Sequence, residues 1–523
     1  MDSLRLDVAI LGGGLAGNFL ARQLRRALPD LRIGLFEKAT ERSWKVGESS
    51  VEITGNYLVR RLALSRYLYE HHLPKNGLRY FFDGPERQTC LTRMSEVGTH
   101  GLPYHPAFQI DRARMERDLL AMNAEQGVEV RAGAKVQALE LGQDGAPHRF
   151  EVLQDGHVQR AEARWVVDAT GRTSLVAKQK GLRIPEEQHA LGAVWGRFER
   201  VTDIDDLGND AFRARVRYTA RGLSTVHLCY PGYWIWFIPL KNGVTSVGVV
   251  GEKRLFDRGV RTDAGFCAFL ESHGAAKQLL VNAKVIDVQS FTQLAYGTTR
   301  FFHADRWGLI GDAASFTDPL YSPGIDFVAL ENDFLCDLVR RDHAGEAPEV
   351  LAERSSLYDR FMRFRHEAAM RLYRGLYGTL GSFELMRMKW ELDIGCYYNL
   401  WVAAYMKDMY LDERFVEQQL RWQPFLLQAL ENFAELFRGL EKDLWQRGAY
   451  HRCNTGRYSH GLENIDFVHE LGLPRSRRTM LKKTADVFNV VRREALDVLD
   501  VEPDSPARAP LPLSEFMVSR PIV

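Results

Sequence analysis

The sequence lacks any close pair of cysteines. Its six cysteines are scattered along the chain, at Cys90, Cys229, Cys267, Cys336, Cys396 and Cys453. This spacing argues against a zinc site, a C-x-x-C redox pair and the disulfide framework of a secreted protein. We therefore expect no metal ion and a reduced, cytoplasmic setting.

The sequence also lacks an excess of charge of either sign and any long apolar run. It carries 69 basic and 68 acidic side chains, a formal net charge of +1. This balance predicts neither nucleic-acid binding nor attraction to anionic membranes, and no stretch has the length and uniform apolarity of a membrane span. The apolar N-terminal segment places its glycines where a strand, a turn and a helix need them, so we expect no targeting signal. A small, mostly uncharged substrate suits this composition.

Hydrophobic patterns predict an α/β fold with several packed regions. A strand, a glycine turn and a helix open a Rossmann-like dinucleotide-binding domain, and a segment rich in Val, Thr, Tyr and Trp indicates a second β-sheet facing the substrate. Long helical patterns predict a helical C-terminal region. The expected boundaries are 1–197 and 293–335 for the two parts of the first domain, 198–292 for the second sheet, 336–500 for the helical region and 501–523 for a Pro-rich tail, extended or loosely docked.

Candidate cofactor residues begin at Gly12, Gly14 and Gly17, which satisfy G-x-G-x-x-G between a predicted strand and a predicted helix. Gly12 permits a tight turn, Gly14 lets the backbone approach a pyrophosphate, and Gly17 lets the helix lie against the strand. Glu37, at the end of the next predicted strand, is placed to accept hydrogen bonds from a ribose. These residues predict a bound dinucleotide, either FAD or NAD.

A second glycine turn favours FAD. Gly311 and Asp312 follow the strand pattern RWGLI, and Arg112 lies in QIDRARMERDLL. With the first fingerprint, these residues resemble the FAD-dependent aromatic hydroxylases, in which the Asp contacts the ribityl chain and the Arg approaches the phosphate and ribityl region. The resemblance spans most of residues 5–335 and implies that FAD is the cofactor. Because the chain carries a single dinucleotide fingerprint, we expect a separate flavin reductase to supply FADH2.

The stretch PGYWIWFIPLKNG places four large rings close together, at Tyr233, Trp234, Trp236 and Phe237. Taken alone it predicts a buried strand, because aromatic side chains favour sheets and Pro239 ends the pairing. The same residues reproduce W-x-W-x-I-P, and the chain therefore resembles the flavin-dependent halogenases, in the branch of tryptophan and phenol halogenases. The resemblance implies that Trp234 and Trp236 stand between flavin and substrate and suppress hydroxylation. The two interpretations are compatible.

Lys75 is the candidate catalytic residue. It lies in K-x-G-x-x-Tyr after a helical segment that follows Val46-Gly47-Glu48, the order in which halogenases carry their catalytic lysine, and the same resemblance places Gly47 at the cofactor. In that family reduced flavin and oxygen give a C4a-hydroperoxide, halide attacks its distal oxygen, and the lysine holds the resulting hypohalous acid. A buried lysine can do this as an ammonium that polarises the acid or as a neutral amine that forms a haloamine.

The segment FTDPLYSPGIDF resembles the part of the family that lies beside flavin and halide, which puts Tyr321 and Ser322 in the flavin and substrate chamber. Tryptophan halogenases carry a glutamate where this chain has Tyr321, so a carboxylate that assists indole is missing. A phenol, resorcinol or pyrrole needs less help, and we expect chlorination or bromination of a phenolic ring. Pro323 removes a backbone N–H that would help to hold halide, whereas Gly324 retains one.

Two other functions fit the same sequence. A flavin-dependent monooxygenase or reductase on this fold would give hydroxylated, epoxidised or reduced product regardless of halide. A non-catalytic flavoprotein would use the exposed face of its helical region to bind a carrier protein or assembly partner. The ring, the position substituted, the choice of chloride or bromide, and whether the substrate is free or carrier-bound stay open.

Overall fold

The first sheet forms the centre of a Rossmann-like fold. The computed structural model describes residues 3–41, 43–256 and 259–523, and within them it places eight strands in this sheet. Strands β19, β10, β1, β2 and β7 run parallel, whereas β18, β9 and β8 join antiparallel. Their bounds are β1 Leu4–Leu11, β2 Ile33–Glu37, β7 Glu129–Ala132, β8 Lys135–Glu140, β9 His148–Gln154, β10 His157–Asp168, β18 Phe302–His303 and β19 Trp307–Leu309. The turn after β1 therefore opens at the carboxyl edge of a parallel sheet, where such folds bind ligands.

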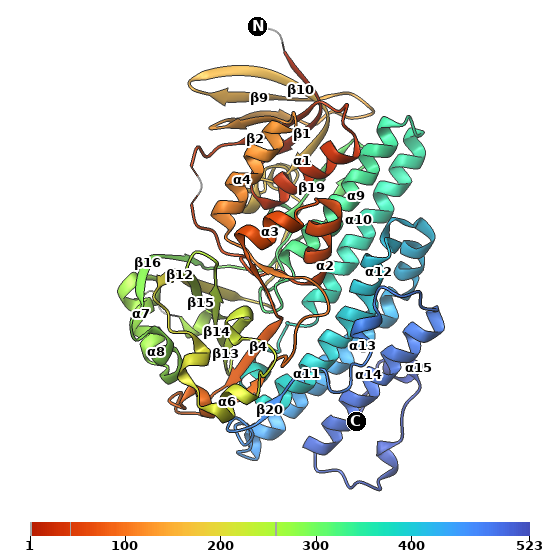
Figure 1. The fold of residues 1–523 in the computed structure, drawn as a ribbon. Coiled ribbons are helices and arrows are strands. Elements are labelled where there is room, and N and C mark those ends of the chain that lie inside the picture. The colour runs from red at the N-terminus through yellow and green to blue at the C-terminus, as the bar shows by residue number, and fades with distance from the viewer. Residues whose placement is uncertain (1–2, 42, 257–258) are drawn as a thin grey trace.

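Helices from both ends of the first domain cover this sheet (Figure 1). Helix α1 (Leu15–Ala27) packs against α4 (Arg112–Glu125) and against α9 (Gly324–His343), which follows β19 in the chain. The buried side of α1 carries Phe19 and Leu20, and its last turn ends in basic residues that suit a helix C-terminus. Residues that are distant along the chain thus complete one domain.

The second sheet lies beside the first and is mostly antiparallel. Among the described residues its strand order is β16-β12-β15-β14-β13-β4-β5-β20. Their bounds are β4 Leu78–Phe82, β5 Ser95–Val97, β12 Leu191–Glu199, β13 Thr225–Tyr230, β14 Tyr233–Pro239, β15 Val244–Glu252, β16 Lys284–Phe291 and β20 Tyr458–Ser459. The sheet thus takes β4, β5, β20 and most of β12 from outside the range 198–292, because strand pairing between distant segments leaves no local pattern in the sequence.

The C-terminal region consists of packed helices (Figure 1). Their bounds are α10 Pro348–Met370, α11 Phe383–Cys396, α12 Ala403–Met406, α13 Glu413–Gln446, α14 Arg477–Val498 and α15 Leu513–Phe516. Helix α11 packs against α13, α14 and the second sheet at β5. Helix α11 therefore covers one end of that sheet.

The tail is docked more firmly than the sequence suggests. Phe516 is fully buried, with its ring 5.8 Å from that of Phe433 and 5.3 Å from that of Phe488. The side chain of Asn432 donates hydrogen bonds to the carbonyls of Phe516 and Val518. An extended or loosely docked tail is therefore a wrong expectation, because one aromatic anchor and one amide hold it.

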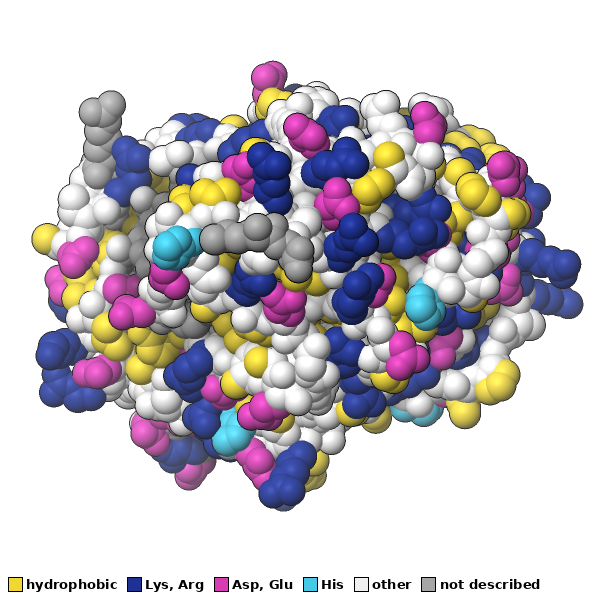
Figure 2. Space-filling model, turned by 90° about the horizontal axis from the view of Figure 1, so that it is seen from above, with side chains coloured by type: hydrophobic (Ala, Val, Ile, Leu, Met, Phe, Trp, Pro, Cys, Tyr) yellow, Lys and Arg dark blue, Asp and Glu magenta, His cyan; other side chains and the backbone are white. Residues whose placement is uncertain are grey.

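Shorter elements connect these parts. They are β3 Leu73–Pro74 paired with β6 Phe108–Gln109, β11 Arg183–Pro185 paired with β17 Tyr296–Thr298, and the helices α2 Glu52–Asn56, α3 Ser65–His71, α5 Leu175–Gln179, α6 Asp210–Ala214, α7 Asp263–Glu271 and α8 Gly274–Leu280. None of the helices formed by the described residues combines the length and apolarity needed to cross a membrane. Figure 2 shows basic and acidic side chains interspersed over the face seen from above.

Candidate active site

The glycine turn after β1 has the geometry that a bound phosphate requires. Gly12 has a φ of +117°, and a Cβ there would lie 2.2 Å from the carbonyl oxygen of Ala169. A Cβ on Gly17 would lie 2.0 Å from the carbonyl oxygen of Gly12, so α1 approaches the strand as closely as glycine allows. At Gly14 the nearest atom to an added Cβ is the Glu116 Oε1 at 3.9 Å, which leaves the backbone there open to a ligand.

Glu37 ends β2 and borders the same opening. Its carboxylate accepts hydrogen bonds from the backbone N–H of Gly13 at 2.8 Å and of Ala39 at 2.9 Å. These bonds fix the carboxylate against the glycine turn, in the position expected of a ribose acceptor. Its contact with a ribose stays a prediction.

Gly47 and Arg112 face the opening from the other side. Gly47 has a φ of +100°, and a Cβ there would lie 3.1 Å from Arg112 Nη1. The Arg112 guanidinium donates to the carbonyl of Val46 and, at 2.7 Å, to Glu116. Glu116 also pairs with Lys45 at 2.6 Å, so the two cations are held in place around one buried carboxylate.

The second glycine turn completes the rim. Gly311 has a φ of +58°, and its N–H donates at 2.6 Å to Glu331, a fully buried side chain whose pKa burial raises to about 8. Burial also raises the pKa of Asp312, and the charge of Arg112 opposes this shift. Asp312 and Arg112 both border the opening.

These residues line one large cavity of about 690 Å³ between the two sheets. Most of the predicted site residues contribute to its wall: Gly12, Gly14, Glu37, Gly47, Arg112, Trp234, Trp236, Gly311, Asp312, Ser322 and Gly324. Three do not, namely Gly17, Lys75 and Tyr321. Gly17 packs behind the glycine turn, Lys75 is hydrogen-bonded to the lining residue Ser49, and Tyr321 precedes the lining residue Ser322.

The wall is one face of the second sheet. Trp234 and Trp236 point into the large cavity from β14, whereas Tyr233, Ile235 and Phe237 belong to the apolar core on the opposite face. Strand register aligns Trp236 with His227 on one side and with Gly248 on the other. A Cβ on Gly248 would lie 2.2 Å from the Trp236 ring, so this glycine gives the indole its space.

Lys75 lies one hydroxyl group away from the cavity. It follows β3, is 1% exposed, and its Nζ donates to Ser49 Oγ at 2.7 Å and to the Ser50 carbonyl at 2.8 Å. Ser49 Oγ in turn hydrogen-bonds to Thr225 Oγ1 at 2.9 Å and accepts from Ser322 Oγ at 2.8 Å. The hydroxyl-bearing residues Ser49, Thr225 and Ser322 all line the cavity, so they join it to the ammonium.

The charge of Lys75 is adjustable. Burial lowers its pKa to about 7, against the opposing effect of the carboxylates of Glu52 and Asp326. Both the ammonium and the neutral amine are therefore populated near neutral pH.

Tyr321 turns away from the large cavity. Its hydroxyl donates at 2.7 Å to Asp393 of α11, and its ring lies 6.0 Å from that of Trp390. Ser322 has a φ of +55°, which turns the chain so that neighbouring side chains point to different sides. Pro323 caps α9, and Gly324 is its exposed first residue with open space around it.

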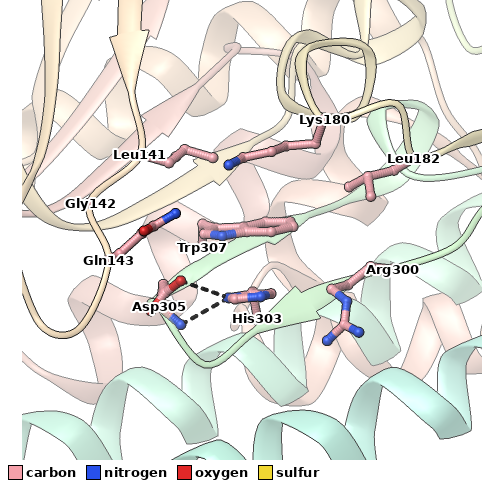
Figure 3. A pocket seen from close by; sticks show the side chains of 9 residues that line it. All are labelled: Leu141, Gly142, Gln143, Lys180, Leu182, Arg300, His303, Asp305 and Trp307. Atoms are coloured by element: carbon pink, nitrogen blue, oxygen red, sulfur yellow. Dashed lines mark hydrogen bonds and ion pairs between the residues drawn. The ribbon is translucent and has the colours of Figure 1, made fainter.

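A smaller hollow of about 200 Å³ lies elsewhere, at the edge of the first sheet. Figure 3 shows Trp307 between His303 and Lys180, and the rings of His303 and Trp307 stack at 4.9 Å. None of the predicted site residues lines it. The large cavity is therefore the candidate active site.

Residues 5–327 match the FAD binding domain family. The chain is 27% identical over 447 residues to the flavin-dependent halogenase chlA of Dictyostelium discoideum, an alignment that covers 77% of this chain and 71% of that protein. The chain belongs to the flavin-dependent halogenases of the FAD binding domain family. The chain is also 27% identical over 348 residues to the 1H-pyrrole-2-carbonyl peptidyl-carrier-protein chlorinase of Pseudomonas fluorescens. That alignment covers 62% of this chain and 73% of the chlorinase. Halogenase PltM has a related fold, with a TM-score of 0.69 at 17% identity over 98% of both chains.

FAD is the cofactor of this halogenase, and the large cavity fits it. The residues that would hold it are Gly14 with its open backbone, Glu37 with its fixed carboxylate, and Arg112 and Asp312 on the cavity wall. Halogenation with FAD as cofactor and halide as substrate is the activity of the flavin-dependent halogenases.

Several residues around the site escape prediction from the sequence of this halogenase. Ser49, Thr225 and Gly248 come together through strand pairing, which no local pattern reveals. Asp393 does leave a signal, because Lys389 stands four residues before it on α11 and forms a buried ion pair with it.

Proposed function

We propose that this halogenase chlorinates or brominates a phenolic ring and that Lys75 holds and directs the halogen. The observation that carries the proposal is the position of Lys75, buried behind Ser49 and joined to the large cavity by three hydroxyl-bearing residues. A lysine buried at a cavity wall is costly unless its charge is used, because burial disfavours the ammonium.

O2 supplies the oxidising power that turns halide into hypohalous acid, and bound FADH2 would supply the two electrons that activate O2. The residues of the chain then have separate tasks. Trp234 and Trp236 keep the substrate away from the cofactor, and Ser49, Thr225 and Ser322 offer hydroxyl groups along the way from the cavity to Lys75. The Lys75 ammonium can donate a hydrogen bond to the acid, and its neutral amine can take the halogen as a haloamine.

The phenolic preference is supported by Tyr321. This position carries a phenol hydroxyl, which donates to Asp393, where tryptophan halogenases carry the glutamate that assists indole. An activated ring reacts without that assistance. We further propose that a separate reductase supplies FADH2, and that the substrate is either free or carrier-bound, as in the chlorinase of Pseudomonas fluorescens.

The test supplies the purified protein with FAD, an independent flavin reductase, NADH, O2 and phenol, with and without bromide. We expect bromophenol only when bromide and the reductase are both present. Hydroxylated phenol formed regardless of bromide would instead support a monooxygenase, and absence of any product under every halide would support a non-catalytic flavoprotein.

A further inference from the structure

A cluster of aromatic side chains lies next to the large cavity, on the same face of the second sheet as Trp236. Tyr80 of β4 stacks on His227 of β13 with ring centroids 4.6 Å apart, and Trp390 of α11 lies 5.2 Å from Tyr80. Tyr321 lies 6.0 Å from Trp390 and 5.8 Å from Tyr373. We call these five residues the Tyr80 cluster.

The Tyr80 cluster adjoins the large cavity without being part of it. His227 belongs to both, because strand register places it between Tyr80 and Trp236 on one face of the sheet. The other four members do not line the cavity. Lys75 lowers the pKa of His227, after the larger effect of burial, so the ammonium lies within electrostatic reach of the cluster.

Two buried polar atoms at the Tyr80 cluster have unused hydrogen-bonding capacity. Asp393 is 3% exposed, and its Oδ2 accepts from both Tyr321 and Lys389. Among the residues that the structure describes, neither Asp393 Oδ1 nor the Tyr80 hydroxyl has a hydrogen-bond partner. A buried polar atom without a partner costs about 1–3 kcal/mol, so such atoms are normally satisfied by a ligand or by water.

The chemistry of this pair of atoms selects the ligand. An ionised carboxylate oxygen accepts hydrogen bonds, so its partner must be a donor. Lys389 already balances the charge of Asp393, which disfavours a cationic donor, and a carboxylate ligand would be repelled by Asp393. A neutral aromatic ring with a hydroxyl group satisfies Asp393 and packs against Tyr80 and Trp390.

We infer that Asp393 determines substrate specificity by accepting, through Oδ1, a hydrogen bond from the ring hydroxyl of the substrate, whose ring packs in the Tyr80 cluster. This inference rests on the proposed function, since it assigns the place of the phenol in that reaction. The Tyr80 hydroxyl could form a hydrogen bond with a second oxygen on the same ring. A hydroxyl that donates to a carboxylate also releases electron density into its ring, which favours attack on the halogen at the ortho and para positions.

The experiment compares phenol with anisole, whose methyl ether has the same ring and no donor. In the wild type, kcat/KM for bromination should favour phenol. Asp393→Asn should lower the phenol-to-anisole ratio of kcat/KM roughly 10- to 100-fold, because the amide oxygen stays with the donors Tyr321 and Lys389 and leaves the amide N–H, which cannot accept a hydrogen bond, towards the substrate. Glu391→Gln is the matched control, since this carboxyl on the same helix faces Arg387, and it should leave the ratio unchanged.

Two further measurements keep the test decisive. The double variant Lys389→Met with Asp393→Leu removes the buried ion pair while keeping apolar volume, so it should fold and show the same loss of preference. Binding of phenol and anisole to the FAD-bound protein, measured by calorimetry without halide, should show the preference without any turnover.

Equal losses for phenol and anisole, or an unchanged ratio in both variants, would overturn the role of Asp393. The binding experiment separates this failure from failure of the proposed function. If halogenation proved independent of Lys75, the calorimetric preference for phenol and its loss in the variants would still be measurable by themselves.

Discussion

At the scale of single residues, the proposed mechanism depends on a lysine that is buried where its charge is disfavoured. Lys75 is almost fully buried and has hydroxyl and carbonyl oxygens as its hydrogen-bond partners. Because the pKa falls to about 7, one residue offers both a polarising ammonium and a nucleophilic amine at the pH of a cell. An arginine would lack the second form.

The shifted pKa of Lys75 predicts a pH-dependent stability. Between pH 7 and pH 10.5 the unfolded chain holds a proton that the folded chain lacks, so the free energy of unfolding of the wild type rises with pH across this window. Lys75→Met lacks this dependence. Its stability advantage over the wild type should therefore fall by about 4 kcal/mol between pH 7 and pH 10.

Urea unfolding at the two pH values measures this difference, with Lys241→Met at an exposed lysine as the matched control. An advantage of Lys75→Met that does not change with pH would show that burial leaves the lysine with its ordinary pKa.

At the scale of elements, the aromatic strand β14 is a buried strand that we propose also separates the cofactor from the substrate. Its odd positions Tyr233, Ile235 and Phe237 pack into one core, and its even positions Trp234 and Trp236 face the large cavity. The alternation is the ordinary period of a strand. An ordinary strand therefore suffices to place both tryptophans at the cavity.

The partition depends on Gly248 of the neighbouring strand. In Gly248→Ala the new Cβ would lie 2.2 Å from the Trp236 ring and 2.6 Å from Trp195 Cβ, so the indole must move. We expect the share of FADH2 oxidised with release of hydrogen peroxide, rather than with halogenation, to rise several-fold.

Gly439→Ala in α13 is the control, because nothing lies within 4 Å of the added Cβ, and it should stabilise the helix by about 0.5–1 kcal/mol with unchanged peroxide release. A folded Gly248→Ala variant with normal coupling of FADH2 oxidation to halogenation would exclude Trp236 from the partition.

The sequence allows prediction of elements with a local signal. The turn at Gly12, the strand that carries Trp234 and the helical C-terminal region all follow from spacing and periodicity, and the structure contains each of them. It does not allow prediction of Thr225 beside Ser49, or of Gly248 beside Trp236, because each pair depends on the register of strands that are far apart. The placement of Tyr321 depends on the turn at Ser322, which leaves no clear signal in the sequence: the sequence puts Tyr321 in the chamber beside the flavin, and the fold turns it towards α11.

At the scale of the whole molecule, segments from both ends of the chain complete each layer. β4 and β20 extend the second sheet, α9 covers the first, and α11 closes the Tyr80 cluster from the C-terminal region. The helical region therefore contributes side chains next to the candidate active site.

The docked tail should contribute measurably to stability. Phe516→Ala removes a ring that is fully buried against Phe433 and Phe488, and we expect the free energy of unfolding to fall by about 3 kcal/mol or more. Val518→Ala, at a side chain that is 48% exposed, should change it by less than about 0.5 kcal/mol. Urea unfolding measures both, and equal effects would mean that the tail is loosely held after all.

The most direct test of the account is the halogen content of the product made without Lys75. Wild type, Lys75→Ala and Lys241→Ala are each given FAD, a flavin reductase, NADH, O2, bromide and phenol, and the products are examined by mass spectrometry for the paired isotopes of bromine. We predict bromophenol from the wild type and from Lys241→Ala, and at least about 100-fold less from Lys75→Ala while it still binds FAD and oxidises FADH2. Bromophenol from Lys75→Ala at close to the wild-type rate would contradict the central claim.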